Sequence, residues 1–214
     1  MLVTGEDTEL ATRIGAVLEH AGAVVQRIHS TPTHEPSGMS EADAAVRELG
    51  GLDVLVNIGP ASLPGDNPDP DRRSPEVERA LEWSMERLLT TTEAALAAMT
   101  AGASIINVVS LSVRTLTSAH LALAAAVVDT TQDLAAFLAE RGIRANVVLG
   151  GPSLEPAVEA ALHTHDDGDS AAGAAQFDAL VYLASESSRY VSGSVISVTR
   201  TADSPGPCPA EGVA

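Results

Sequence analysis

The sequence predicts a Rossmann-like α/β fold, a doubly wound parallel sheet between two layers of helices. Short apolar runs bounded by Gly, Asn or Ser alternate with helical patterns along the chain. These runs are continuous in hydrophobicity, which is typical of parallel strands that helices cover on both faces. With 214 residues, 45% of them hydrophobic, the chain can bury one substantial core.

The expected elements follow one another in strand–helix order. Strands are predicted at residues 1–4, 23–28, 53–57, 104–110, 143–149 and 194–198. Helices are predicted at residues 10–18, 41–49, 75–99, 118–141 and 176–184. Loops are predicted at residues 59–74 and 150–175, the second with a short helix at 155–162. Ser40 could cap the second helix, and Gly142 suits a left-handed stop after the fourth.

One domain is expected over residues 1–200, followed by a Pro/Gly-rich tail over 201–214. No run of 18 apolar residues predicts a membrane span, and the first residues lack the basic region of a signal peptide. We therefore expect a cytoplasmic protein that does not associate with membranes.

Charge and residue usage exclude several classes of partner. The formal net charge is −17, which repels nucleic acid and anionic membrane surfaces. All basic residues are arginines, so the chain contains no lysine. The single cysteine, Cys208, permits neither an intrachain disulfide nor a thiolate metal cluster. Residues 163–169 contain His and Asp, but this pattern is typical of a solvated acidic loop, and no metal site is expected.

Fragments spread from residue 2 to about 200 resemble the short-chain dehydrogenase/reductase family. They are Leu-Val-Thr-Gly at 2–5, Leu-Asp-Val-Leu-Val-Asn at 52–57, Ile-Ile-Asn-Val at 105–108, Gly-Ile-Arg-Ala-Asn-Val-Val at 142–148, Tyr-Leu-Ala-Ser at 182–185 and Tyr-Val-Ser-Gly at 190–193. All of them occur in the family's order. The resemblance implies a Rossmann-like fold and, in an ordinary member, hydride transfer with NAD(P).

The phosphate-binding turn departs from the pattern that the resemblance implies. In the family this turn reads Thr-Gly-x-x-x-Gly-x-Gly, and its glycines let the backbone approach a diphosphate. Thr4 and Gly5 match, whereas the second and third glycines fall on Glu9 and Ala11. A carboxylate there adds negative charge, and a Cβ tightens the helix approach. Glu9 is also an ordinary first-turn residue that the helix dipole favours.

The adenosine side of the cofactor site is altered as well. The acidic residue that binds a ribose hydroxyl in the family is missing near residues 27–29. The interval from there to Asn57 is too short for the usual helix and strand, so one helix–strand unit is expected to be shortened. Asn57 alone remains of the family's Asn-Asn-Ala-Gly, and Pro60 removes a backbone donor. We expect no bound cofactor, unless the family role in NAD(P) binding persists.

The catalytic positions that the resemblance implies carry other residues. Ser84 stands at the Asn position, His120 at the Tyr position and Ala124 at the Lys position, and only Ser110 is retained. In the family the Lys holds the nicotinamide ribose and activates the Tyr. Because the chain has no lysine, no shift of the alignment supplies one.

Ser110 and His120 remain as candidate catalytic residues. Both should lie near the carboxyl ends of the strands, where a Ser–His pair could transfer protons or carry acyl groups. The alternative is that His120 is a polar residue in the first turn of a helix. No Gly-x-Ser-x-Gly elbow surrounds Ser110.

The helices at 75–99 and 118–141 are candidates for a subunit interface, as they are in the family. They carry small and apolar residues at close-packing spacings: Leu88, Ala95, Ala98 and Met99 on the first, and Ala122, Ala125, Ala126 and Val128 on the second. Around Leu121 to Val128 the second helix is apolar nearly all round, which favours a partner. The alternative is that these residues face the chain's own sheet.

Three functions fit these observations. We favour a non-catalytic pseudoenzyme that acts as a structural or regulatory subunit, paired with itself or with an active short-chain dehydrogenase/reductase. The alternative is an enzyme that works without nicotinamide, a lyase, isomerase or cyclase that uses Ser110 and His120. The third is an oxidoreductase with an atypical NAD(P) site.

Overall fold

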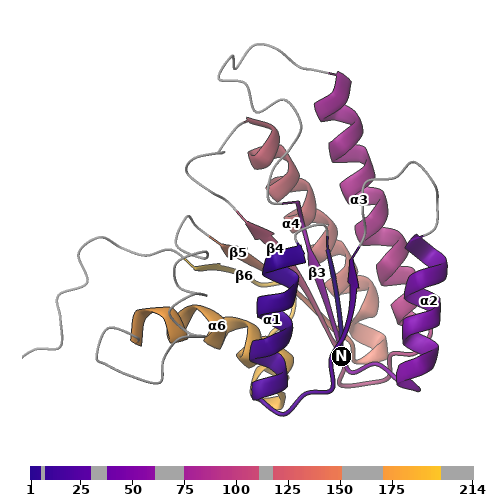
Figure 1. The fold of residues 1–214 in the computed structure, drawn as a ribbon, viewed down its shortest axis with the longest axis vertical. Helices are drawn as coiled ribbons and strands as arrows, with labels where there is room; N and C mark the ends of the chain where they lie inside the picture. Colours follow the sequence, from indigo (N-terminus) through magenta and orange to yellow (C-terminus); the bar gives the residue numbers. More distant parts are fainter. Residues whose placement is uncertain (6–7, 30–37, 61–74, 111–117, 151–170, 199–214) are drawn as a thin grey trace, which may run out of the picture.

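The structure, a computed structural model, describes residues 1–5, 8–29, 38–60, 75–110, 118–150 and 171–198. These residues form a six-stranded sheet whose strands are all parallel (Figure 1). The strands are β1 Leu2–Gly5, β2 Gln26–His29, β3 Val54–Ile58, β4 Ser104–Ser110, β5 Arg144–Gly150 and β6 Val195–Val198.

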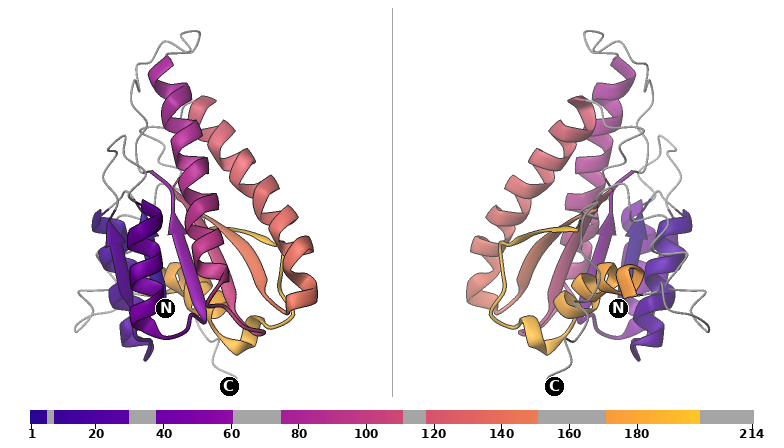
Figure 2. Two further views of the ribbon diagram at one scale, coloured as in Figure 1. Left: turned by 90° about the vertical axis from the view of Figure 1, so that its right-hand side faces the viewer. Right: turned by 90° about the vertical axis from the view of Figure 1, so that its left-hand side faces the viewer.

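Helices cover both faces of this sheet (Figure 2). They are α1 Thr8–His20, α2 Gly38–Leu49, α3 Pro75–Leu96, α4 Ser118–Leu138 and α6 Ala171–Ala184, with short 3₁₀ helices η1 Ala139–Arg141 and η2 Glu186–Ser188. Buried side chains of α2, α3 and α4 pack on one face of the sheet, and those of α1 and α6 pack on the other. The predicted three-layer Rossmann-like fold is confirmed.

The strand order is β2-β1-β3-β4-β5-β6. In the common doubly wound order 3-2-1-4-5-6, a third strand lies outside the second one. Here β2 is the edge strand of the described sheet, and only residues 30–37 separate it from α2. The predicted shortening of one helix–strand unit is therefore confirmed, because the described sheet has no strand outside β2.

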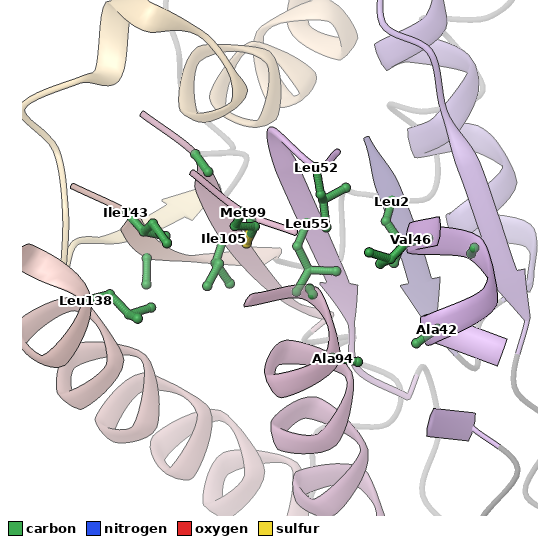
Figure 3. Packing of buried hydrophobic residues seen from close by; sticks show 14 of the residues in the cluster. Leu2, Ala42, Val46, Leu52, Leu55, Ala94, Met99, Ile105, Leu138 and Ile143 are labelled. Atoms are coloured by element: carbon green, nitrogen blue, oxygen red, sulfur yellow. The ribbon is translucent and has the colours of Figure 1, made fainter. Parts of the chain in front are cut away.

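Two hydrophobic cores lie on opposite faces of the sheet. Successive residues of a strand point to opposite faces, so Leu55 of β3 packs toward α2, α3 and α4, whereas Val56 packs toward α1 and α6. Figure 3 shows the first core, in which Leu2, Leu55 and Ile105 from neighbouring strands meet side chains of the helices. The continuous apolar runs of the sequence follow from this coverage on both faces.

The boundaries of some elements differ from those predicted. Helix α6 begins at Ala171, so the prediction of a loop through 171–175 is wrong. Four of these five residues are alanines, which have the highest helix propensity. The predicted stop at Gly142 is confirmed, because its φ is 67°. The expected helix at 155–162, the His/Asp segment at 163–169, Cys208 and the tail from 201 lie outside the described residues.

Arg144 connects the start of β5 to the segment after α6. Its side chain is buried, and its Nη1 donates hydrogen bonds to the carbonyl oxygen of Leu183 at 3.1 Å and to the Ser188 Oγ at 2.5 Å. Burial lowers the pKa of the Arg144 guanidinium, and the carboxylate of Glu186 partly offsets this effect. Arg144 therefore holds η2 against the end of the sheet.

We expect Arg144→Met to lower the free energy of unfolding by about 2–3 kcal/mol, because buried carbonyl oxygens lose their donors. Urea denaturation followed by circular dichroism measures this change. Arg189→Met is the matched control, because Arg189 is exposed and its Cζ lies 4.7 Å from the Tyr190 ring centre. The control should lose less than about 1 kcal/mol. Equal losses in the two variants would contradict the role given to Arg144.

Candidate functional site

A row of polar side chains crosses the centre of the sheet. Thr4 of β1, Asn57 of β3 and Asn107 of β4 are register partners on adjacent strands. All three are buried, with 3%, 6% and 0% of their surface exposed. Register partners in parallel strands point to the same face, and hydrogen bonds show that this is the face of α3 and α4.

Threonines of the two helices complete this row. The Asn57 Nδ2 donates to the Thr92 Oγ1 of α3 at 3.2 Å and to the Asn107 Oδ1 at 2.9 Å. The Asn107 Nδ2 donates to the Thr131 Oγ1 of α4 at 2.8 Å, and the Thr131 Oγ1 donates to the Val127 carbonyl oxygen at 2.6 Å. One hydrogen-bonded chain thus joins α3, two strands and α4.

The direction of this chain is fixed at one end by the Val127 carbonyl, which can only accept. The Thr131 hydroxyl therefore donates to it and accepts from Asn107. Asn107 must turn its amide nitrogen to Thr131 and its oxygen to Asn57. The Asn57 Oδ1 is then the remaining acceptor, and it is buried without a hydrogen bond to any described residue. A water or a ligand donor would satisfy it.

Arg87 places a positive charge at the end of this row. Its Nη2 donates to the Thr4 Oγ1 at 3.1 Å, across 83 positions of sequence. Its Cζ lies 5.2 Å from the ring centre of Trp83, one helical turn earlier in α3. The Arg87 side chain therefore spans from α3 to the carboxyl end of β1, the edge where open α/β sheets bind ligands.

A small cavity lies between the polar row and the two helices. Its volume is about 30 Å³, which is room for about one water molecule. Its polar lining comes from Thr4, Asn57, Ser84, Arg87 and Thr91, and the rest from Ile58, Gly59, Pro60, Leu88, Val108, Leu123 and Val127. Among the described residues, no cluster of His, Cys, Asp or Glu could hold a metal ion.

The first turn after β1 serves the packing of the chain itself. A Cβ at Gly5 would lie 2.7 Å from the Ile58 Cβ and 2.9 Å from the Ile58 carbonyl oxygen, so close packing against β3 requires glycine there. Glu9 lies in the first turn of α1. Ala11 is fully buried in the core beside Ile14. Its methyl group at the family's third glycine position therefore fills core volume.

The structure places the predicted catalytic positions in different surroundings. Ser110 is the last residue of β4, paired in register with Gly150, and its side chain lies outside what the structure describes. His120 lies in the first turn of α4, but its side chain is only 1% exposed. His120 is thus a first-turn residue, as the alternative interpretation had it, but a buried one. His120 is not among the described residues that line the cavity.

Ala124, at the position of the family's Lys, is packed in the core. It is 7% exposed and belongs to a cluster with Leu123, Val109 and Val147. Ser84, at the Asn position, lines the cavity. Sequence reasoning missed Arg87, Thr92, Asn107 and Thr131. The signal for Asn107 was a polar residue inside an apolar strand, as for Asn57.

The candidate interface residues pack inward on the first helix and are partly exposed on the second. On α3, which ends at Leu96 and not at the predicted residue 99, Ala95 is buried in the chain's own core and Leu88 packs against the cluster that contains Leu123. Met99, beyond the end of this helix, is buried in the same core as Ala95. These residues therefore pack within the chain itself, as the alternative interpretation predicts. On α4, by contrast, Ala122 and Ala125 are exposed, whereas Ala126 and Val128 are partly buried.

The outer side of α4 is unusually apolar. The segment Ala119–Arg141 is long and apolar enough to cross a membrane by length and composition alone, with a mean hydropathy of 1.4. Its inner side packs on the sheet through Leu123 and Val127. On its outer side, 53% of Leu121 and 76% of Phe137 are exposed. The segment is thus a surface helix with apolar residues on both sides.

Solved structures share this architecture at low sequence identity. A short-chain dehydrogenase/reductase mutant from Serratia marcescens is 21% identical, with a TM-score of 0.68 over 92% of this chain and 93% of that one. The ligand-free aldohexose dehydrogenase of Thermoplasma acidophilum is 18% identical, with a TM-score of 0.69 over 92% and 91%. A short-chain dehydrogenase from Burkholderia cenocepacia, solved with NADP, is 21% identical, with a TM-score of 0.65 over 92% and 84%.

The sequence also matches a family model. No curated protein sequence matches the chain significantly. A family model described as enoyl-(acyl carrier protein) reductase, however, matches residues 2–200. Because this match covers nearly the whole chain, and the fold agrees with it, the protein belongs to the short-chain dehydrogenase/reductase family.

Proposed function

We propose that this protein is a non-catalytic member of its family and acts as a structural or regulatory subunit. It pairs with itself or with an active family member through α3 and α4. The observation that carries this proposal is the burial of Ala124, because the position of the catalytic Lys is filled by a methyl group inside the core. No lysine exists elsewhere in the chain to replace it.

The residues at the carboxyl edge of the sheet do not fit a nicotinamide cofactor. Glu9 stands in the first turn of α1 at the position of the family's second glycine, and the negative charge of this residue type opposes the binding of a diphosphate. The Ala11 methyl fills the space of the family's third glycine, and Ala124 offers no donor to a ribose. NADP is bound in the structure of the Burkholderia cenocepacia relative.

The exposed apolar side of α4 supports a role in assembly. Near the start of the helix, Leu121, Ala122 and Ala125 are exposed, and Phe137 is exposed at its far end, beyond Asp129 and Asp133. Covering such a surface with a partner contributes roughly 25 cal/mol for each Å² of apolar area removed from water. Exposed apolar side chains close together on a surface helix are typical of an interaction surface.

The first prediction concerns the cofactor. We expect no saturable binding of NAD(H) or NADP(H) at millimolar concentrations, because Glu9, Ala11 and Ala124 all act against the same ligand. Titration calorimetry and nicotinamide fluorescence measure this, with the Burkholderia cenocepacia relative as a positive control for NADP. Binding in the micromolar range would support the atypical oxidoreductase instead.

The second prediction separates a buried His120 from a catalytic one. His120→Ala should lower the free energy of unfolding by about 2 kcal/mol, because truncating a side chain with 1% exposure leaves a cavity. Leu121→Ala is the control, because it truncates the exposed neighbouring residue, and in the isolated chain it should change stability by less than about 0.5 kcal/mol. Unchanged stability of the His120 variant would favour the Ser110/His120 enzyme.

The third prediction concerns assembly. The chain should form a complex with itself or with an active family member encoded near it, and Ala125→Arg should dissociate that complex by placing a charge in a desolvated seam. Sedimentation velocity of the two co-expressed proteins measures this. Ala44→Arg is the control, because it adds the same charge to an exposed position on α2. A chain that stays monomeric alone and with such candidates would contradict the proposal.

A further inference from the structure

The outward side of α3 is a continuous acidic ridge. Residues 78, 82, 86, 89 and 93 are all exposed and follow one another at three- and four-residue spacing, so they lie along one stripe of the helix. Four of the five are glutamates: Glu78, Glu82, Glu86 and Glu93. We call these four residues the acidic ridge. None of them makes an ion pair within the described part of the chain.

The neighbouring surface of α4 adds negative charge and apolar area. Asp129 and Asp133 are exposed on the outer side of this helix, beyond Leu121 and Ala125. Helices α3 and α4 lie together on one face of the sheet (Figure 2). Their outer surfaces therefore form one face, which is apolar near the start of α4 and at Phe137, and acidic along α3 and at Asp129 and Asp133.

Few cations on this face can balance the acids. The exposed basic residues of α3, α4 and η1 are Arg79 and Arg141. The Arg79 Nε donates to the Pro75 carbonyl oxygen at 3.1 Å. The Arg141 Nη2 donates to the carbonyl oxygens of Leu96 and Met99 at 2.8 and 3.3 Å. The guanidinium group of Arg79 thus binds a backbone carbonyl at the start of α3, and that of Arg141 binds backbone carbonyls at and just after its end.

Pairing of this face with a second copy brings like charges together. A two-fold interface places the same surface patch on both sides. The acidic ridge would then meet either the ridge of the copy or the aspartates on its α4, and the net charge of −17 on each chain adds to the repulsion. Like charges set opposite each other across an interface oppose binding strongly.

We propose that the face of α3 and α4 binds a different protein chain, whose facing helices carry Arg or Lys opposite the acidic ridge. This inference rests on the proposed function, because it names the partner for the same surface. The apolar residues of α4 supply buried area, and the ridge selects the partner and rejects a second copy. The assembly is therefore heteromeric, and its affinity falls as salt screens the charges.

A charge-reversed form of the chain itself can act as the basic probe. A quadruple variant places cations at the four ridge positions through the exposed substitutions Glu78→Lys, Glu82→Lys, Glu86→Lys and Glu93→Lys. Native mass spectrometry of this variant mixed with ¹⁵N-labelled wild type separates the mixed dimer from both self-dimers by mass. Circular dichroism of the variant checks that it is folded.

The mixed dimer should bind at least about tenfold more tightly than the wild-type self-dimer at low salt. Raising the salt concentration from about 50 mM to about 500 mM should remove most of this difference in affinity. At the higher concentration the Debye length is shorter than the distance between the charges on the two sides of the interface. A wild type that self-associates as tightly as the mixture, with no effect of salt, would overturn the inference. It would leave the proposed function standing.

A matched pair of double variants tests whether the position of the charge matters. Glu82→Lys with Glu86→Lys reverses two charges on the ridge, whereas Asp53→Lys with Asp178→Lys reverses two exposed charges away from it, at the start of β3 and on α6. Only the ridge variant should pair with the wild type. Equal pairing by both, or pairing by neither, would overturn the inference. The proposed function is tested separately by Ala125→Arg with a family member.

Discussion

The hydrogen-bonded chain from Thr92 through Asn57 and Asn107 to Thr131 is the interaction on which the rest of the structure depends. It joins the two central strands to α3 and α4 through side chains that are almost fully buried. Each such bond contributes only about 1 kcal/mol net, but losing one partner leaves a buried polar group whose desolvation costs about 1–3 kcal/mol. This series of hydrogen bonds therefore fixes the rotation of both helices about their axes. Apolar packing alone leaves that rotation less defined.

The rotation of α3 and α4 decides which residues face inward and which face outward. It turns Arg87 toward Thr4 and lines the small cavity, and it leaves the acidic ridge and Leu121 on the outside. The same constraint thus accounts for the inner site and for the outer surface. Inside, Asn57 keeps an acceptor without a described partner, and Ala124, at the position of the family's lysine, is packed in a hydrophobic cluster. The polar groups of the row hold α3 and α4 to the two central strands.

Much of the fold could be predicted because hydrophobicity follows coverage by helices. The run at 104–110 reads as a strand and forms β4 over the same residues, since both of its faces are buried. The start of α6 was predicted too late, because the segment 171–175 lacks the apolar–polar periodicity of an amphipathic helix, although its four alanines favour helix by propensity. The candidate site was harder to predict from the sequence than the fold. Asn57 could be singled out because it matches the first residue of the family's Asn-Asn-Ala-Gly, but its partners depend on how α3 and α4 rotate. The contact of Arg87 with Thr4 and the burial of His120 depend on the same tertiary packing, which local sequence does not specify.

The position of β2 at the edge of the described sheet has a consequence for solubility. An edge strand presents unpaired backbone N–H and C=O groups that can pair with an edge strand of another molecule. In a sheet with one more strand on this side, those groups would be paired within the chain. Here the exposed strand is only Gln26–His29, and three of its four residues are polar or basic. Short length and polar side chains are the usual protection of edges against aggregation, so the strand is suited to the edge position that the loss of its neighbour gives it.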